Sequence, residues 1–176
     1  MEAALAEERD LEGARDAALR VIANVRRAVS GEPAIVERAT ACSDADIVLM
    51  AAAVSDYRPV ETEVAKRPKD QESWEIELEP TVDVLRELSE RRTNGQVLVG
   101  FAAEAGADVG RAEAKRVRKG VDLIVLNDVS RRDIGFDVDH NEVVLVAAGD
   151  ATHVPRATKR AIAGAVLDRV EQLLSS

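Results

Sequence analysis

The sequence feature that most constrains the fold is a continuous apolar run at residues 47–54, Ile-Val-Leu-Met-Ala-Ala-Ala-Val, followed directly by Ser55, Asp56 and, two residues later, Arg58. A run that is apolar on both faces is typical of a central strand in a parallel sheet covered by helices on each side. Its small last residues allow a ligand to approach closely. Ligands of open α/β sheets bind just outside the carboxyl ends of the strands, so we predict a binding edge here.

Two later stretches have the same form. Residues 96–104 run from an apolar segment through two alanines to Glu104, and residues 121–128 end in the pair Asn127-Asp128. If the three predicted strands are parallel and adjacent, Asp56, Glu104 and Asn127 line one crevice. Strand ends are often polar simply because loops are, but three similar ends separated by helical patterns favour a binding edge.

The remaining pattern predicts an α/β domain with a mostly parallel central sheet. The other expected elements are a half-exposed strand at 74–79, a helix at 82–92 capped by Thr81, a helix at 109–119 ended by Gly120, a strand at 142–146 and a helix that begins after Thr158. The expected buried stripe of the last helix is Ile162, Val166, Val170, Leu173 and Leu174.

Composition narrows the class of protein. The net charge of −9 argues against a nucleic-acid backbone as the main partner. Cys42 is the single cysteine, so neither an internal disulfide nor a cysteine metal site can form. Residues 1–30 lack the pattern of a signal peptide, and no apolar run is long enough to span a membrane. We therefore expect a soluble cytoplasmic protein.

Two groups of basic residues have two interpretations each. The loop Lys66-Arg67-Pro68-Lys69 is either solvated or a flap that closes over an anion. Lys115 and Lys119 are four residues apart on one face of the predicted helix, which is usually a solvated surface. In an acidic protein, local gathering of such lysines would be needed to hold an anionic ligand.

Four segments together resemble one known family. They are Ala51-Ala52-Ala53-Val54-Ser55-Asp56-Tyr57-Arg58-Pro59, Val99-Gly100-Phe101-Ala102-Ala103-Glu104, residues 122–130 with the Asn127-Asp128 pair, and Gly135-Phe136-Asp137-Val138-Asp139-His140-Asn141. In this order, across residues 46–174, they resemble phosphopantothenate–cysteine ligase, the synthetase half of the bacterial bifunctional coenzyme A biosynthesis protein.

The resemblance implies a Rossmann-like three-layer sandwich with a small antiparallel edge or flap region, working as a homodimer. It implies a CTP-dependent ligase that uses Mg²⁺. In that reaction the carboxylate of 4′-phosphopantothenate attacks the α-phosphate of CTP, and cysteine then displaces CMP from the acyl-cytidylate to give 4′-phosphopantothenoylcysteine. Such chemistry needs a neutralised triphosphate and two aligned substrates. A flavin-dependent decarboxylase domain encoded upstream is a further implied partner.

The resemblance also carries site residues. Those matching the family's CTP contacts are Asp56, Lys66, Thr81, Val82, Asp83, Val84, Phe101, Lys115 and Lys119. Those matching contacts to the acid substrate are Ala52, Ala53 and Asn127. Two departures concern nucleotide contact: the flap reads Lys-Arg-Pro-Lys instead of Lys-Ile-Lys-Lys, and Thr81-Val82 replaces Asn-Pro. No catalytic residue and no metal ligand is assigned.

We expect a single domain over residues 1–176, with a family-like core at 46–176 and a divergent N-terminal part at 1–45. The family's glycine-rich loop and its asparagine-serine-serine-glycine stretch have no counterpart here, which predicts a truncated enzyme that binds CTP weakly and makes little product. The alternative is a catalytically impaired nucleotide-binding or dimerisation fragment. A Rossmann-type dehydrogenase is disfavoured because no glycine-rich dinucleotide fingerprint follows any predicted strand.

Overall fold

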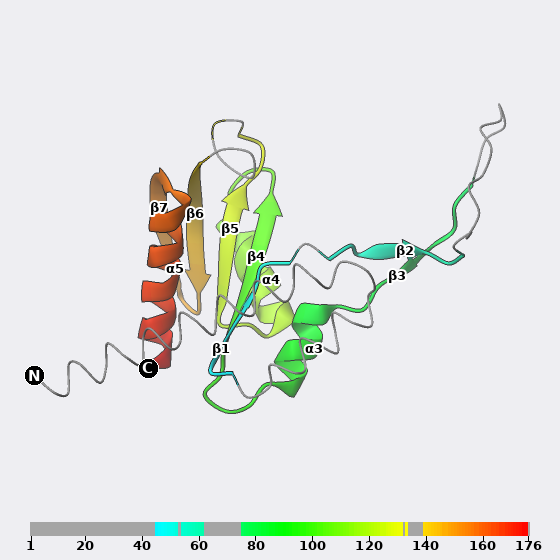
Figure 1. Cartoon of the computed structure of the whole chain (residues 1–176), viewed down its shortest axis with the longest axis horizontal. Helices are drawn as coiled ribbons and strands as arrows, with labels where there is room; N and C mark the ends of the chain where they lie inside the picture. The colour runs from blue at the N-terminus through cyan, green and yellow to red at the C-terminus, as the bar shows by residue number, and fades with distance from the viewer. Residues whose placement is uncertain (1–44, 53, 62–74, 132, 134–138, 176) are drawn as a thin grey trace, which may run out of the picture.

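The computed structural model describes residues 45–52, 54–61, 75–131, 133 and 139–175. They form a five-stranded sheet of order β1-β4-β5-β6-β7 and a separate two-stranded ribbon, β2-β3 (Figure 1). The strands of the sheet are β1 (Ile47–Met50), β4 (Val97–Glu104), β5 (Leu123–Asp128), β6 (His140–Ala147) and β7 (Asp150–Thr158). The ribbon strands are β2 (Tyr57–Pro59) and β3 (Leu78–Pro80), and the helices are α3 (Val84–Arg91), α4 (Val109–Lys119) and α5 (Lys159–Leu174).

The prediction that the strands now labelled β1, β4 and β5 are parallel and adjacent is confirmed. Strand β1 pairs with β4 in parallel, with Val48 opposite Leu98, and β4 pairs with β5 in parallel, with Gly100 opposite Ile124. Strands β6 and β7 then continue the sheet in antiparallel fashion. The sheet is therefore mixed. Its parallel strands are β1, β4 and β5, and the predicted binding edge is at their carboxyl ends.

Strand β7 was not expected from the sequence. It follows β6 after a turn in which Gly149 has a φ of 71°. Its side chains are mostly exposed and it contains Pro155, a residue that argues against a central strand. Proline is tolerated in β7 because the strand lies at the sheet edge.

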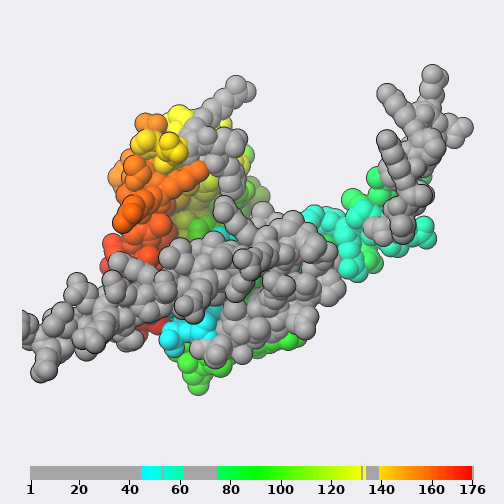
Figure 2. All heavy atoms as spheres, viewed as in Figure 1, coloured from blue at the N-terminus to red at the C-terminus, as the bar shows by residue number. Residues whose placement is uncertain are grey.

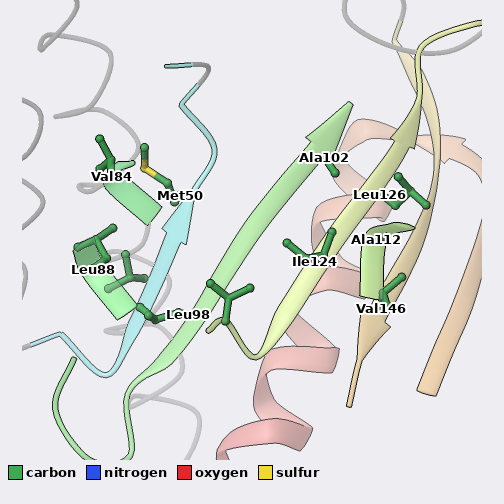
Figure 3. Packing of buried hydrophobic residues seen from close by; sticks show 11 residues of the cluster. Met50, Val84, Leu88, Leu98, Ala102, Ala112, Ile124, Leu126 and Val146 are labelled. Atoms are coloured by element: carbon green, nitrogen blue, oxygen red, sulfur yellow. The ribbon is translucent and has the colours of Figure 1, made fainter. Parts of the chain in front are cut away.

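Two apolar layers make the fold a three-layer sandwich. Successive residues of β5 alternate between them: Ile124 faces α3 and α4, and Val125 faces α5. The first layer includes Met50, Val84, Leu88, Leu98, Ala102, Ala112, Ile124 and Leu126 (Figure 3). The second includes Leu49, Val99, Leu123, Val125, Leu145, Ile162, Val166 and Val170. In α5, Leu173 is only partly buried against this layer, and Leu174 is 43 % exposed, contrary to its predicted burial.

Helix caps explain where the helices begin and end. Helix α3 begins two residues later than predicted, because Asp83 rather than Thr81 is its N-cap and accepts a hydrogen bond from the Arg86 backbone N–H at 3.2 Å. The predicted caps of the other helices are confirmed: Gly120 ends α4 with a φ of 66°, and the Thr158 hydroxyl caps α5.

The β2-β3 ribbon extends away from the sheet (Figures 1 and 2). Tyr57 lies opposite Pro80, and β3 is shorter than the strand predicted at 74–79. The predicted flap at 66–69, the N-terminal residues 1–44 and Ala53 lie outside the described residues. Among the described helices, none is both long and apolar enough to cross a membrane.

Candidate functional site

A pocket of about 300 Å³ lies at the carboxyl end of β1, the edge predicted from the sequence. Four segments that are distant in the chain contribute to it: the end of β1 with the loop after it, the segment leading into α3, strand β4 and helix α4. The lining residues are Met50, Ala52, Val54, Ser55, Asp56, Thr81, Val82, Asp83, Val84, Leu85, Phe101, Lys115 and Lys119. The volume is at the lower end of the range for small-molecule sites.

Two hydrogen bonds from Thr81 join two walls of this pocket. Its backbone N–H donates to the Asp56 carbonyl at 3.0 Å, and its hydroxyl donates to the Ser55 carbonyl. Thr81 was expected to cap α3, which is wrong. The residue instead fixes the loop after β1 against the segment that leads into the helix.

Helix α4 supplies both predicted lysines to the pocket. The Asp108 side chain starts the helix by accepting from the Arg111 backbone N–H, and Gly120 ends it directly after Lys119. The four-residue spacing therefore places Lys115 and Lys119 on the pocket face. Lys119 is 18 % exposed and forms an ion pair with Asp83. Lys115 has no hydrogen bond or ion pair within the part of the chain that the structure describes.

Asp83 serves two partners at once. Its Oδ1 atom accepts from the Arg86 backbone N–H, and its Oδ2 atom accepts from Lys119 Nζ. Burial alone would raise the pKa of the Asp83 carboxyl, but the hydrogen bonds from Lys119 and Arg86 together with their charges outweigh it, and the pKa lies below its ordinary value. The carboxylate is thus ionised at neutral pH.

Phe101 lines the pocket at the edge of the sheet. It follows Gly100, which is the last β4 residue paired with β1, so no β1 residue lies opposite Phe101 and its side chain stays 41 % exposed. Its register partner Val125 faces α5, so the Phe101 side chain lies on that side of the sheet, beyond the end of β1. An aromatic ring at this free edge can stack on a planar ring of a ligand that extends past the strand end.

The expectation that three polar strand ends line one crevice is wrong in part. Asp56 lines the pocket, but Glu104 and Asn127 do not. Glu104 lies three residues beyond Phe101 and pairs with Arg111 at 3.9 Å. Asn127 has the same parity along β5 as Val125, so it is on the α5-facing side of the sheet.

Asn127 nevertheless carries an unusual feature. Its Oδ1 atom is buried and has no hydrogen-bond partner among the described residues. A buried polar atom without a partner is costly and needs an explanation. Ala103, a residue with a small side chain, lies opposite Asn127 in the register of β4 and β5.

Some pocket residues were not singled out from the sequence. Leu85 is the clearest case, and Gly100 is the signal that could have found it. A Cβ atom at Gly100 would lie 2.7 Å from Leu85 Cδ2, so this glycine lets the start of α3 lie close to the sheet. Arg58, expected at the strand end, instead pairs with Glu79 across the ribbon at 2.7 Å and does not line the pocket.

The described residues contain no group of three or more histidine, cysteine, aspartate or glutamate side chains that could hold a metal ion. A divalent cation in this pocket would therefore need ligand oxygens in addition to protein ones. Of the two pocket carboxylates, Asp83 is engaged by a lysine, and Asp56 has no lysine partner among the described residues.

These features define a class: a three-layer α/β domain with a partly basic pocket at the carboxyl end of its parallel strands. Comparison with known families is more specific. Residues 12–174 match the family described as DNA/pantothenate metabolism flavoprotein C-terminal domain, and the chain belongs to this family.

Individual relatives agree with this assignment. The chain is 38 % identical over 144 residues to the coenzyme A biosynthesis bifunctional protein CoaBC of Mycolicibacterium smegmatis, covering 76 % of this chain and 34 % of that protein. It is 34 % identical over 125 residues to a cysteine/cysteine sulfinic acid decarboxylase of an unknown prokaryotic organism, covering 71 % and 34 %. The chain thus spans about a third of the length of these relatives.

A solved structure shares the fold. The crystal structure of the C-terminal domain of coenzyme A biosynthesis bifunctional protein CoaBC has a TM-score of 0.62 and 32 % sequence identity to this chain. The match covers 80 % of this chain and 63 % of that one. The predicted family and the predicted α/β architecture are thereby confirmed.

Proposed function

We propose that this chain is a phosphopantothenate–cysteine ligase domain that uses CTP in coenzyme A biosynthesis. Family membership and the relatives named for coenzyme A biosynthesis support the pathway. The observation that carries the nucleotide part is the gathering of Asp56, Phe101, Lys115 and Lys119 around one pocket. These residues lie far apart in the sequence, and each occupies a position that matches a CTP contact of the ligase family.

The chemistry explains why such a pocket is needed. A carboxylate resists attack by an amine until one of its oxygens becomes part of a good leaving group. The carboxylate oxygen of 4′-phosphopantothenate forms a bond to the α-phosphorus of CTP, and pyrophosphate leaves. The cysteine amine then attacks the acyl carbon, loses a proton, and CMP leaves. Both steps develop charge on phosphate oxygens, which fixed cations stabilise.

The pocket residues divide these tasks. Lys115, without a partner among the described residues, provides a cation for the phosphates, and Phe101 provides a stacking face for the base. Mg²⁺, held by phosphate oxygens with Asp56 as its protein ligand, would neutralise further charge on the triphosphate. Asp56 is suited to this because its carboxylate lines the pocket and has no lysine partner within the described part of the chain.

Asn127 is proposed to contact the acid substrate, as the family resemblance implies. The orphaned Oδ1 atom supports this, because an incoming amide or hydroxyl of 4′-phosphopantothenate could donate to it. Asn127→Leu, of similar volume, tests the idea. We expect it to raise thermal stability, since the unpaired oxygen is gone, and to weaken binding of 4′-phosphopantothenate. Unchanged binding with higher stability would show that Asn127 is only a structural defect.

Nucleotide preference tests the proposal directly. Titration calorimetry with CTP and ATP, each with Mg²⁺, should give tighter binding of CTP. Equal or tighter binding of ATP would contradict the proposal.

Turnover separates the ligase from the alternative, a nucleotide-binding module without catalysis. Pyrophosphate release is measured with CTP, 4′-phosphopantothenate and cysteine, omitting each in turn. A ligase requires both CTP and the acid for release, and cysteine for the final product. Binding of CTP with no acid-dependent release would favour the alternative.

We also propose that the chain forms a homodimer through the β2-β3 ribbon. Tyr57, Ile76 and Leu78 in and beside the ribbon are each more than half exposed, and an isolated two-stranded ribbon is marginally stable in water. Leu78→Ser should shift sedimentation toward the monomer. Val117→Ser, at an exposed apolar site on α4, is the matched control and should not. A monomeric parent chain would contradict the proposal.

A further inference from the structure

The two pocket lysines differ in their surroundings. Lys119 is held by Asp83, while Lys115 has no such partner among the described residues. Both members of the Lys119–Asp83 ion pair are held in place by the ends of helices. Asp83 is anchored as the N-cap of α3, and Lys119 is the last residue of α4. The Ser89 hydroxyl donates to the Gly120 carbonyl at 2.8 Å and joins the same two helices next to the pair.

This arrangement affects any anion that enters the pocket. A phosphate that approaches Lys119 meets a cation whose charge is already compensated by Asp83, and it also meets the carboxylate itself. The negative charges of the phosphate and of the Asp83 carboxylate repel each other at short range. This repulsion is weaker in water than in a dry protein interior. A ligand that interacts only through its phosphates has nothing to offset this repulsion, whereas one that also contacts Phe101 and the pocket walls does.

We propose that Asp83 is a specificity-determining residue that keeps Lys119 paired in the free pocket and so disfavours simple polyphosphates relative to nucleotides. The inference rests on the proposed function, since it concerns the same pocket. It gives Asp83 a role beyond contact with the nucleotide. Under the proposed reaction, it also disfavours retention of the product pyrophosphate.

Asp83→Asn separates the two roles of this side chain. Asparagine is as good an N-cap as aspartate, so the start of α3 is preserved while the charge that engages Lys119 is removed. Circular dichroism and the unfolding midpoint report whether the fold is retained. The matched control is Asp56→Asn, which removes the same charge from the same pocket without releasing a lysine of the described residues.

The test is calorimetric titration of the parent chain and both variants with inorganic tripolyphosphate, pyrophosphate and CTP. In Asp83→Asn we expect tripolyphosphate and pyrophosphate to bind about three- to fivefold more tightly, the scale of one partly exposed ion pair. We expect CTP to gain less, so that discrimination falls. Asp56→Asn should give a smaller gain for the polyphosphates.

Three results would overturn the inference: no gain in Asp83→Asn, weaker binding of all three ligands, or an equal gain in both variants. Equal gains would mean that general charge, not the Lys119 pair, sets the affinity. The outcome is separable from the proposed function. If the parent fails to prefer CTP over ATP, the proposed function fails, while the polyphosphate comparison still decides the role of Asp83.

Discussion

The contact between α3 and α4 beside the pocket leads to a quantitative prediction for Gly120→Ala. Gly120 has a φ of 66°, in the left-handed region, and a Cβ atom there would lie 2.3 Å from Ser89 Oγ. That hydroxyl donates a hydrogen bond to the Gly120 carbonyl. The substitution therefore strains the backbone and displaces the hydroxyl that joins the two helices.

The two costs can be estimated separately. A non-glycine residue in the left-handed conformation costs about 1–2 kcal/mol. Turning the Ser89 hydroxyl away loses one hydrogen bond, worth roughly 0.5–1.5 kcal/mol. We therefore expect Gly120→Ala to lower the free energy of unfolding by about 1.5–3.5 kcal/mol. In a Ser89→Ala background the hydroxyl is absent, and the same change should cost only the backbone term, about 1–2 kcal/mol.

Urea denaturation of the parent, both single variants and the double variant measures these values in one double-mutant cycle. The expected coupling between Ser89 and Gly120 is about 1 kcal/mol, from the lost hydrogen bond. The same cost of Gly120→Ala in both backgrounds would refute the described contact. A cost below about 0.5 kcal/mol would refute the left-handed cap itself, since that is less than the backbone term.

Three further predictions concern carboxylates that hold the fold. Asp83→Ala should destabilise by about 1 kcal/mol through loss of the α3 cap, and Asp83→Asn should not; chemical denaturation compares them. Asp122→Ala should cost roughly 1–3 kcal/mol, because Asp122 accepts from the buried Leu98 N–H at 2.8 Å, and Asp122→Asn should cost less. Hydrogen bonds from the Ser130 hydroxyl and from the Gly106 and Ser130 backbone lower the pKa of Asp128 below its ordinary 3.8. Its stabilisation is therefore complete above about pH 4 and is lost as the pH falls through the folded-state pKa, so Asp128→Asn should flatten the acid limb of the stability profile.

The parallel part of the sheet and most of the pocket could be predicted from the sequence. Continuous apolar runs specified β1, β4 and β5, since a strand buried on both faces leaves that pattern. Helical spacing placed Lys115 and Lys119 on one face, and the glycine after them marked the end of the helix. The roles assigned to individual residues came from the resemblance to a family, not from the pattern.

Other features depended on contacts that no local pattern encodes. Thr81 and Asp83 are both good N-caps, and the choice between them follows from the bond of Thr81 to Ser55, which comes from a distant segment. Strand β7 is mostly exposed, so it leaves no apolar signature. Side chains along β5 alternate between the two faces of the sheet. Which face Asn127 occupies can be read from the sequence only once the register of β5 is known.

The central claim is that the pocket at the carboxyl end of β1 binds the triphosphate of CTP. The most direct measurement is calorimetric titration of Mg²⁺–CTP into the parent chain, Lys115→Ala and Arg118→Ala. A lost charge-assisted contact is worth roughly 1.5–3 kcal/mol, so Lys115→Ala should weaken binding by at least about tenfold. Arg118, on the same helix but outside the pocket lining, should leave the affinity nearly unchanged when removed. If Lys115→Ala binds CTP as the parent does, or if both variants lose affinity equally, the nucleotide does not bind in this pocket.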